Sequence, residues 1–210
     1  MKSWFWLLIV CSYCSSGRAA TDYRPGDIIL LPVDCHACDA IELETGSPYA
    51  HAGLVVIESG KPIIIEAWSK VERTSLEDFL QRAKLGVSPL LIRAEELWLN
   101  YNSPARLAAL NTKLIKIFES KYAGLAYDDD FLWNNVDEHG REKLYCSELI
   151  TKLLNELLFQ KVPTYKMTYS KARRFWSRYF QGVVPDGQPG NNPGSFMKSG
   201  LFFVVESIFP

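Results

Sequence analysis

The chain has 210 residues, of which 48% are apolar and 22% are charged, and its formal net charge is −1. This length and composition suit one globular domain with a hydrophobic core, and they exclude a disordered or low-complexity chain. The balanced charge also argues against a general nucleic-acid binder, which needs a basic surface.

The N-terminal residues 1–20 have the pattern of a secretory signal peptide. Lys2 precedes a short apolar run at 4–10, and Ala19-Ala20 ends the segment with small residues. The apolar run is too short to span a bilayer, and no later stretch is long enough to do so. We therefore expect an exported protein, periplasmic or extracellular, without a transmembrane segment.

Cleavage at Ala20 leaves a single domain at 21–210, with 21 Lys and Arg against 24 Asp and Glu. Two alternatives stay open for the N-terminus. In one, residues 1–20 form a helix of the fold. In the other, the protein is a lipoprotein modified at Cys11 or Cys14.

The apolar pattern then predicts a mixed succession of strands and helices. In chain order we expect a strand at 28–31, an irregular stretch at 34–50, strands at 51–57 and 62–68, a helix at 75–83, a strand at 87–93, a helix from 103 to 124, a long polar loop at 126–143, helices at 146–159 and 172–180, a Pro/Gly/Asn loop at 182–194 and a strand at 201–207. The strand at 51–57 is apolar on both faces, which predicts a buried central strand. The fold class is therefore α+β, with a small antiparallel sheet packed against helices.

Cys146 is the first candidate for a catalytic group. It lies at the start of the predicted helix 146–159, where the helix dipole favours a thiolate and free backbone N–H groups can bind an oxyanion. If Cys35 and Cys38 pair, Cys146 remains as a free thiol in an oxidising compartment. By position alone, a buried structural cysteine at the start of a core helix is the simpler interpretation.

His51 is the candidate base for this thiol. It is one of three histidines, and it stands at the mouth of the buried strand 51–57. A polar ring in that place is held rigidly and can still reach a cleft. The alternative is a surface histidine that happens to precede a strand.

Glu66 is the candidate for the group that orients the His51 ring. It interrupts an apolar strand, where a charge is costly unless it is paired. A two-residue hairpin loop at Ser59-Gly60 would place Gly53 opposite Glu66 and make Glu66 a diagonal neighbour of His51 on one sheet face. We expect Gly53 to leave room for the carboxylate. A loop one residue longer would turn Glu66 to the other face, where it would be a partly exposed strand glutamate.

These motifs resemble the circularly permuted NlpC-type cysteine hydrolases, and most closely the YiiX/YebB-like group. The similar segments are Tyr-Ala-His-Ala-Gly around His51, Ile-Ile-Glu-Ala around Glu66 and Tyr-Cys-Ser-Glu-Leu around Cys146. The resemblance covers about residues 24–160, and the order His, acid, Cys is that of the permuted branch. It implies a papain-like fold and a Cys-His-polar triad that cleaves amide or ester bonds.

The segment Cys35-His36-Ala37-Cys38 allows several interpretations. We place a short disulfide or two packed thiols first, ahead of a redox pair or half of a metal site. A zinc site would need two further ligands, and only His36 and His139 stand outside the triad. The redox interpretation needs a helix N-terminus in a thioredoxin-like unit, which the residues before Cys35 do not indicate. We therefore expect no metal and no cofactor.

Tyr49 and Tyr145 stand close in sequence to His51 and Cys146. Either hydroxyl is a candidate for binding a substrate carbonyl, with simple packing as the alternative. We take both as candidate substrate-binding residues.

Together these features predict a secreted or periplasmic thiol hydrolase that cleaves amide bonds through Cys146, His51 and Glu66. Peptide of the cell wall, peptidoglycan, is the default substrate. Three alternatives remain: a lipid-directed thiol acyltransferase or esterase with the same triad, a binding protein of the same fold without turnover, and a redox protein that uses Cys35 and Cys38.

Overall fold

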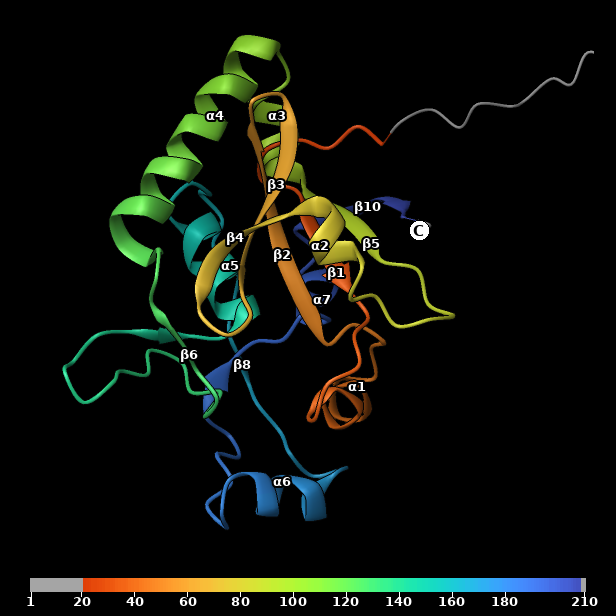
Figure 1. Ribbon diagram of the computed structural model, residues 1–210, viewed down its shortest axis with the longest axis vertical. Coiled ribbons are helices and arrows are strands. Elements are labelled where there is room, and N and C mark those ends of the chain that lie inside the picture. The colour runs from red at the N-terminus through yellow and green to blue at the C-terminus, as the bar shows by residue number, and fades with distance from the viewer. Residues whose placement is uncertain (1–20, 209–210) are drawn as a thin grey trace, which may run out of the picture.

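A six-stranded antiparallel sheet organises the computed structural model, which describes residues 21–208; the predicted signal peptide at 1–20 lies outside the described residues. In spatial order its strands are β10 (Phe202–Ser207), β5 (Leu90–Ala94), β1 (Ile28–Leu31), β2 (His51–Glu58), β3 (Lys61–Ala67) and β4 (Val71–Ser75). Figure 1 shows the long β2–β3 hairpin in the middle of the molecule. The strand that begins with His51 is therefore central, as predicted.

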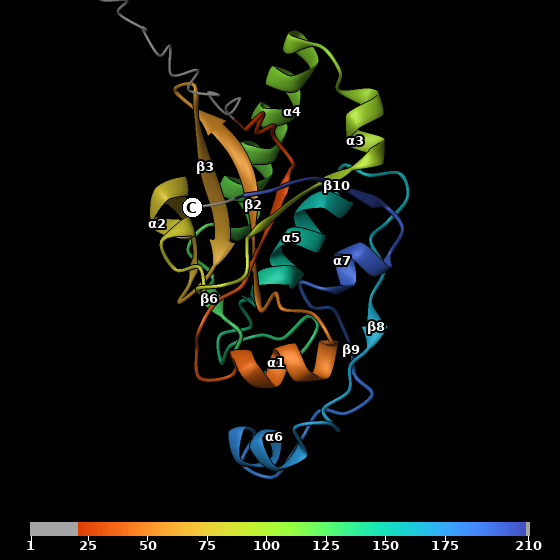
Figure 2. The ribbon, with the colours of Figure 1, turned by 90° about the vertical axis from the view of Figure 1, so that its right-hand side faces the viewer.

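Helices cover both faces of this sheet. They are α1 (Cys38–Thr45), α2 (Leu76–Leu80), α3 (Glu95–Asn100), α4 (Pro104–Ile117) with a π-helical continuation (Phe118–Tyr122), α5 (Cys146–Asn155), α6 (Arg173–Tyr179) and α7 (Ser195–Lys198). In Figure 2, α3, α4, α5 and α7 lie on one side of the sheet and α2 on the other, with α1 and α6 below its end. The predicted α+β class, a small antiparallel sheet packed against helices, is confirmed.

Four short strands complete the structure near the lower end of the sheet. Strand β6 (Ala126–Tyr127) pairs in parallel with β7 (Lys143–Leu144), and β8 (Tyr165–Lys166) pairs antiparallel with β9 (Pro189–Gly190). The predicted polar loop at 126–143 is therefore closed at its base by β6 and β7. The segment between residues 165 and 190 is closed at its base in the same way by β8 and β9.

The core has two parts because side chains of a strand alternate between the sheet faces. On one face, Leu54 of β2 belongs to the larger cluster, which includes Leu114 of α4 and Leu149 of α5. On the other face, Val55 of β2 belongs to a smaller cluster with Phe79 of α2. Both faces of β2 are thus buried, which explains why its sequence is apolar throughout.

The stretch 34–50 was expected to be irregular, and this expectation is wrong. Helix α1 begins there at Cys38 and ends at Gly46, whose φ of 64° is left-handed. Its sequence is rich in acidic residues, and Cys38 and Ala40 are its buried residues. Such a short helix has a weak apolar pattern and depends on tertiary contacts, so periodicity does not detect it.

The β2–β3 hairpin has the predicted register. Ser59 and Gly60 both have positive φ, 51° and 77°, as a two-residue turn with the twist of the strands requires. Glu58 pairs with Lys61 and Leu54 pairs with Ile65, so Gly53 comes opposite Glu66. Glu66 therefore shares a sheet face with His51.

Gly53 has a different role from the one predicted. A Cβ at this position would lie 2.3 Å from Ile64 Cγ2 and 2.7 Å from Phe79 Cε2. The missing side chain thus makes room for the Phe79 ring, which in turn packs on His51 with ring centroids 5.6 Å apart. The prediction that Gly53 makes room for the Glu66 carboxylate is wrong.

We expect Gly53→Ala to lower the free energy of unfolding by about 1–3 kcal/mol, because the added methyl overpacks a filled site. Urea unfolding measures the loss. Gly60→Asn is the control, since nothing lies within 4 Å of an added Cβ there and Asn tolerates positive φ. If both variants lose the same stability, close packing at Gly53 is not the cause.

Candidate active site

His51 and Glu66 form a buried pair at the lower end of the β2–β3 hairpin. His51 Nε2 lies 2.7 Å from Glu66 Oε2. The two residues are only 3% and 1% exposed. Because Nε2 is bonded to the carboxylate, Nδ1 is the ring nitrogen that is left for Cys146.

The electrostatics of this pair favour a charged ring. Burial alone would lower the pKa of His51, but interactions with Cys146 and Glu66 outweigh burial and raise this pKa to about 9. Burial alone would raise the pKa of Glu66, but His51 and then Arg82 lower it to about 2. At neutral pH the arrangement is thus an imidazolium held by a carboxylate.

Arg82 holds the second oxygen of the Glu66 carboxylate, and sequence reasoning missed it. Arg82 Nη2 lies 2.6 Å from Glu66 Oε1. The guanidinium also lies 4.4 Å from the ring centroid of Trp68. The Trp68 and His51 rings in turn meet edge to face, with their centroids 4.9 Å apart. The His51 ring is therefore fixed by a bonded carboxylate on one nitrogen and by aromatic rings around it.

Cys146 is the first residue of α5, and this helix packs against β2 and β3. Tyr145 precedes it in an extended conformation, so no side chain caps the first backbone N–H groups of the helix. Cys146 is 5% exposed and is the free cysteine of the described residues 21–208. The hairpin and α5 thus bring His51, Glu66 and Cys146 together from segments far apart in the sequence.

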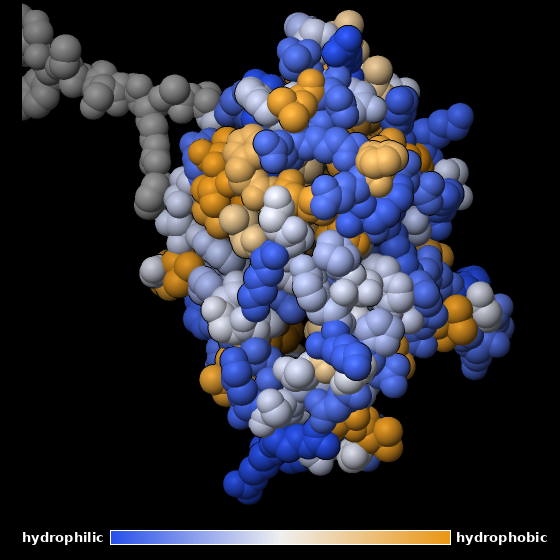
Figure 3. Space-filling view, turned by 180° about the vertical axis from the view of Figure 1, so that it is seen from behind, coloured by the Kyte–Doolittle hydropathy of each residue, from blue (hydrophilic) through white to orange (hydrophobic). Residues whose placement is uncertain are grey.

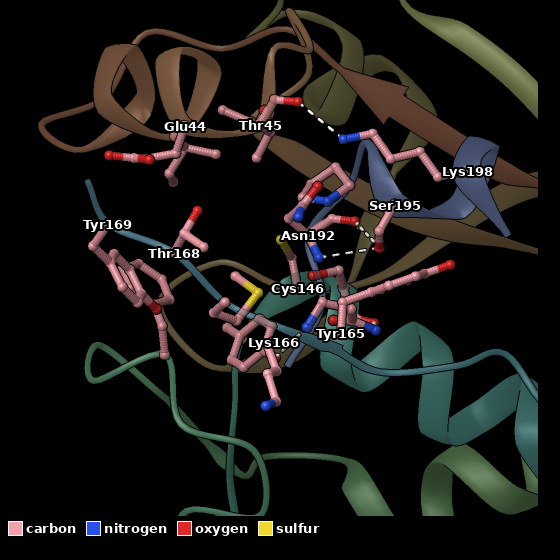
Figure 4. A pocket seen from close by; sticks show the side chains of 18 of the residues that line it. Glu44, Thr45, Cys146, Tyr165, Lys166, Thr168, Tyr169, Asn192, Ser195 and Lys198 are labelled. Atoms are coloured by element: carbon pink, nitrogen blue, oxygen red, sulfur yellow. Dashed lines mark hydrogen bonds between the residues drawn. The ribbon is translucent and has the colours of Figure 1, made fainter. Parts of the chain in front are cut away.

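The thiol faces a cavity of about 230 Å³. Several parts of the chain form its wall: α1, Ala50 before β2, the start of the 126–143 loop, the start of α5, the segment 165–169, Trp176 of α6 and the segment 191–198. Figure 4 shows their side chains converging around Cys146. Figure 3, a view from behind, shows a narrow hollow with an apolar floor above the end formed by α6. The cavity is the natural place for a substrate.

The two tyrosines predicted to bind substrate differ in their placement. Tyr145 lines the cavity, and its hydroxyl accepts a hydrogen bond from the Asn191 amide at 3.1 Å. The Tyr49 hydroxyl instead donates to the Ser88 carbonyl at 3.5 Å, and its ring packs on the larger core cluster. Tyr49 is not among the lining residues, so its position gives no support for a role in substrate binding.

Cys35 and Cys38 form a disulfide at the start of α1. A helix does begin at this point, contrary to the expectation, but β1 and β2 on either side of it are antiparallel. A thioredoxin-like unit would need parallel strands here. Within residues 21–208 no three His, Cys, Asp or Glu side chains are grouped as metal ligands.

Two buried carboxylates that sequence reasoning did not single out hold the loop at 126–143: Asp128 bonds within the loop, and Glu148 ties the loop to α5. Asp128 accepts bonds from the Leu132 amide and Asn135 Nδ2. Glu148 accepts one from the Asn134 amide at 2.8 Å and lies 2.7 Å from Lys152 Nζ. Burial raises the pKa of Glu148 to about 7, although the Asn134 amide and Lys152 oppose the shift.

This anchored loop also carries part of the cavity wall. Tyr127 and Phe131 line the cavity, and burial and the nearby Cys146 raise the pKa of the Tyr127 hydroxyl well above its usual value. The hydroxyl is therefore neutral and able to donate a hydrogen bond beside the thiol. Tyr127 lies in the two-residue strand β6, which is too short to give a pattern in the sequence.

The fold is that of a papain-like protein in which α5, the helix that begins with Cys146, comes late in the chain. Residues 22–202 match the family described as permuted papain-like amidase enzyme, YaeF/YiiX, C92 family, and the chain belongs to that family. One relative is the uncharacterized protein YiiX of Escherichia coli strain K12. It is 28% identical over 156 residues, which cover 74% of this chain and 69% of the relative.

A solved structure of yiiX from Escherichia coli O157:H7, described as a metalloprotein, has the same fold. It superposes with a TM-score of 0.73 at 23% sequence identity, covering 89% of this chain and 98% of the other. Because the two sequences are only 23% identical, this structural similarity shows a shared fold and nothing more. Among the described residues of our chain, no helix is both long and apolar enough to span a membrane.

Glu66→Gln should lower the pKa of His51 from about 9 toward the ordinary histidine value of about 6.5, because the charge beside the ring is lost. The raised pKa stabilises the fold at pH below about 6.5, and this stability is lost as the pH rises through 9. Between pH 6.5 and 9 the free energy of unfolding should therefore fall less in the variant than in the wild-type protein. NMR titration of the three histidines measures the pKa. Glu58→Gln, an exposed change on β2, is the control, and an unchanged His51 pKa in Glu66→Gln would show that the carboxylate does not set it.

Glu148→Ala should release the 126–143 loop, because the Asn134 amide and Lys152 lose a buried partner. We expect a loss of about 1–3 kcal/mol in the free energy of unfolding and faster hydrogen exchange at residues 132–135. Glu156→Ala, at the exposed end of α5 where it pairs with Lys121, is the matched control. Equal exchange in both variants would contradict the anchoring role.

Proposed function

We propose that this protein is an exported cysteine amidase in which Cys146 is the nucleophile, His51 the base and Glu66 the orienting acid. The observation that carries the proposal is the buried His51 ring, which is bonded to Glu66 through Nε2 and interacts with Cys146 at the wall of a substrate-sized cavity. Membership of the permuted papain-like amidase family supports a cysteine hydrolase. The family membership leaves open the bond and the substrate.

The reaction follows from the protonation states at the site. With its pKa raised to about 9, the His51 ring is a base strong enough to take the thiol proton as the Cys146 sulfur attacks the substrate carbonyl carbon. The backbone N–H groups at the start of α5 and the Tyr127 hydroxyl can donate hydrogen bonds to the oxyanion that forms. His51 then gives its proton to the leaving amine, and the acyl group remains on sulfur as a thioester. Water, deprotonated by His51, hydrolyses the thioester and restores the thiol.

Peptide of the cell wall is the substrate we favour. The pattern of residues 1–20 would send the chain to the periplasm or the outside of the cell, and the Cys35–Cys38 disulfide suits an oxidising compartment. Cell-wall peptides carry amide bonds in such a compartment. The second candidate is a lipid-directed thiol acyltransferase or esterase with the same triad, which is favoured by apolar residues such as Ile41, Phe131 and Met167 in the cavity wall.

Iodoacetamide should label Cys146 at neutral pH at least tenfold faster than it labels a free thiol such as glutathione, because His51 holds the proton. His51→Ala should lose this advantage. Cys146→Ala should remain folded but lose all amide cleavage. His36→Ala, which changes an exposed histidine that packs on α6, is the matched control.

A substrate panel decides between the two candidates. Release of amines from cell-wall peptides supports the amidase, and transfer or hydrolysis of lipid acyl chains supports the alternative. Slow labelling of Cys146 together with no turnover on either class would leave a binding protein of the same fold.

A further inference from the structure

Polar atoms without partners gather around the cavity. Among residues 21–208, seven buried side-chain N or O atoms have no hydrogen-bond partner. Six of the seven belong to residues that line the cavity, namely Glu44, Ser147, Tyr169, Trp176, Asn191 and Asn192. Buried polar atoms are normally bonded to protein, to ordered water or to a ligand, so this concentration marks a site built for a polar ligand.

The chemistry of these atoms selects a donor-rich ligand. Three of them are acceptors, on Glu44, Asn191 and Asn192, while the indole N–H of Trp176 is a donor. The Asn191 amide orientation is fixed, because its Nδ2 donates to the Ser147 carbonyl. An acyl chain would leave all these groups unsatisfied, which is costly in a buried place.

One end of the cavity is anionic. Glu44 Oε1 accepts a hydrogen bond from the Ala172 amide at 2.7 Å, and Oε2 has no partner. Tyr169 is 3% exposed and its hydroxyl is also unpartnered. Figure 4 shows Glu44, Thr168 and Tyr169 together at one side of the cavity, with Cys146 near its middle. Asp186 and Asp128 also lie near Tyr169, but they pair with Arg173 and Lys143.

Three lysines lie near this cavity, and none of them neutralises Glu44. Lys171 Nζ donates to the Leu43 and Glu44 carbonyls, and Lys198 Nζ donates to the Thr45 carbonyl. Lys166 lies on the exposed strand β8. Within the described part of the chain, no Lys, Arg or His nitrogen comes within 4.0 Å of the Glu44 carboxylate, whereas Glu42 on the same helix pairs with Lys84.

Aromatic rings surround the same end. Tyr169 and Trp176 meet edge to face with centroids 5.1 Å apart, and Phe131 meets Trp176 in the same way at 6.2 Å. Aromatic faces attract an ammonium group, and a carboxylate beside them strengthens the attraction. Few neutral ligands would use both features.

We propose that the end of the cavity formed by Glu44, Tyr169 and Trp176 binds a protonated amine of the substrate. The amine lies to one side of the carbonyl that Cys146 attacks, so the protein selects short peptides with a free amino group rather than acyl lipids. This inference rests on the proposed function for the position of the cut, but the amine site itself does not require turnover.

The test is a binding measurement on the full-length Cys146→Ala protein. The probes are alanyl-lysine amide with the α-amine and the ε-amine each either free or acetylated, and octanoyl-glycinamide as an acyl chain, titrated by calorimetry at pH 7. We expect one of the two acetylations to weaken binding by about tenfold or more, as for the loss of a charged hydrogen bond. Glu44→Gln should abolish this preference, because it removes the charge while Oε1 still accepts from Ala172.

Glu42→Gln is the matched control, since Glu42 lies on α1 but is not among the lining residues and should keep the preference. Equal binding of all peptide probes, or tighter binding of octanoyl-glycinamide, would overturn the inference. If the amine preference holds but Cys146 of the wild-type protein shows neither fast labelling nor turnover, the proposed function fails and the amine site stands.

Discussion

The active site depends on the register of one hairpin. The left-handed Ser59 and Gly60 close the β2–β3 turn in two residues, and this places Glu66 on the sheet face of His51. A slip of one residue would put the carboxylate among the apolar side chains of the opposite face. The burial of Glu66 is tolerated because its two oxygens are each taken, one by His51 and one by Arg82. The turn thus fixes the tautomer, the charge and the direction of the base.

The proposed nucleophile and the proposed base approach from the two sides of the sheet. His51 and Glu66 stand on the face covered by α2, whereas Cys146 begins α5, which packs on the other face. They meet where β2 begins, because the sheet gives way there to loops and the short helix α1. This geometry is compatible with permutation of the chain, since it requires only that the hairpin end carrying His51 and the helix end carrying Cys146 lie at the same edge of the sheet. Their order along the chain is immaterial.

How far the sequence predicts this site depends on the range of each interaction. The hairpin, the N-terminus of α5 and the triad residues follow from local patterns, namely a two-residue turn, an apolar stripe and a charge in an apolar strand. Arg82 reaches Glu66 from beyond α2, and no local pattern links them. The cavity wall is harder still, because 165–169 and 191–198 have little regular structure and are placed by contacts such as that of Asn191 with Tyr145. Tyr49 shows the limit of sequence proximity, because it lies two residues before His51 but does not line the cavity.

Helix α1 illustrates how tertiary contacts complete what the sequence leaves weak. An eight-residue helix rich in acidic residues is not stable alone. The disulfide constrains its start, and Lys171 and Lys198 satisfy the carbonyls of Leu43, Glu44 and Thr45 at its end. The cysteine pair thus has a structural role as a cross-link at the start of α1. A helix held at both ends presents Glu44 to the cavity in a fixed position, and a fixed carboxylate loses little entropy when it binds a charged group. The rigidity of α1 therefore contributes to the proposed selectivity of the cavity for amines as well as to the stability of the fold.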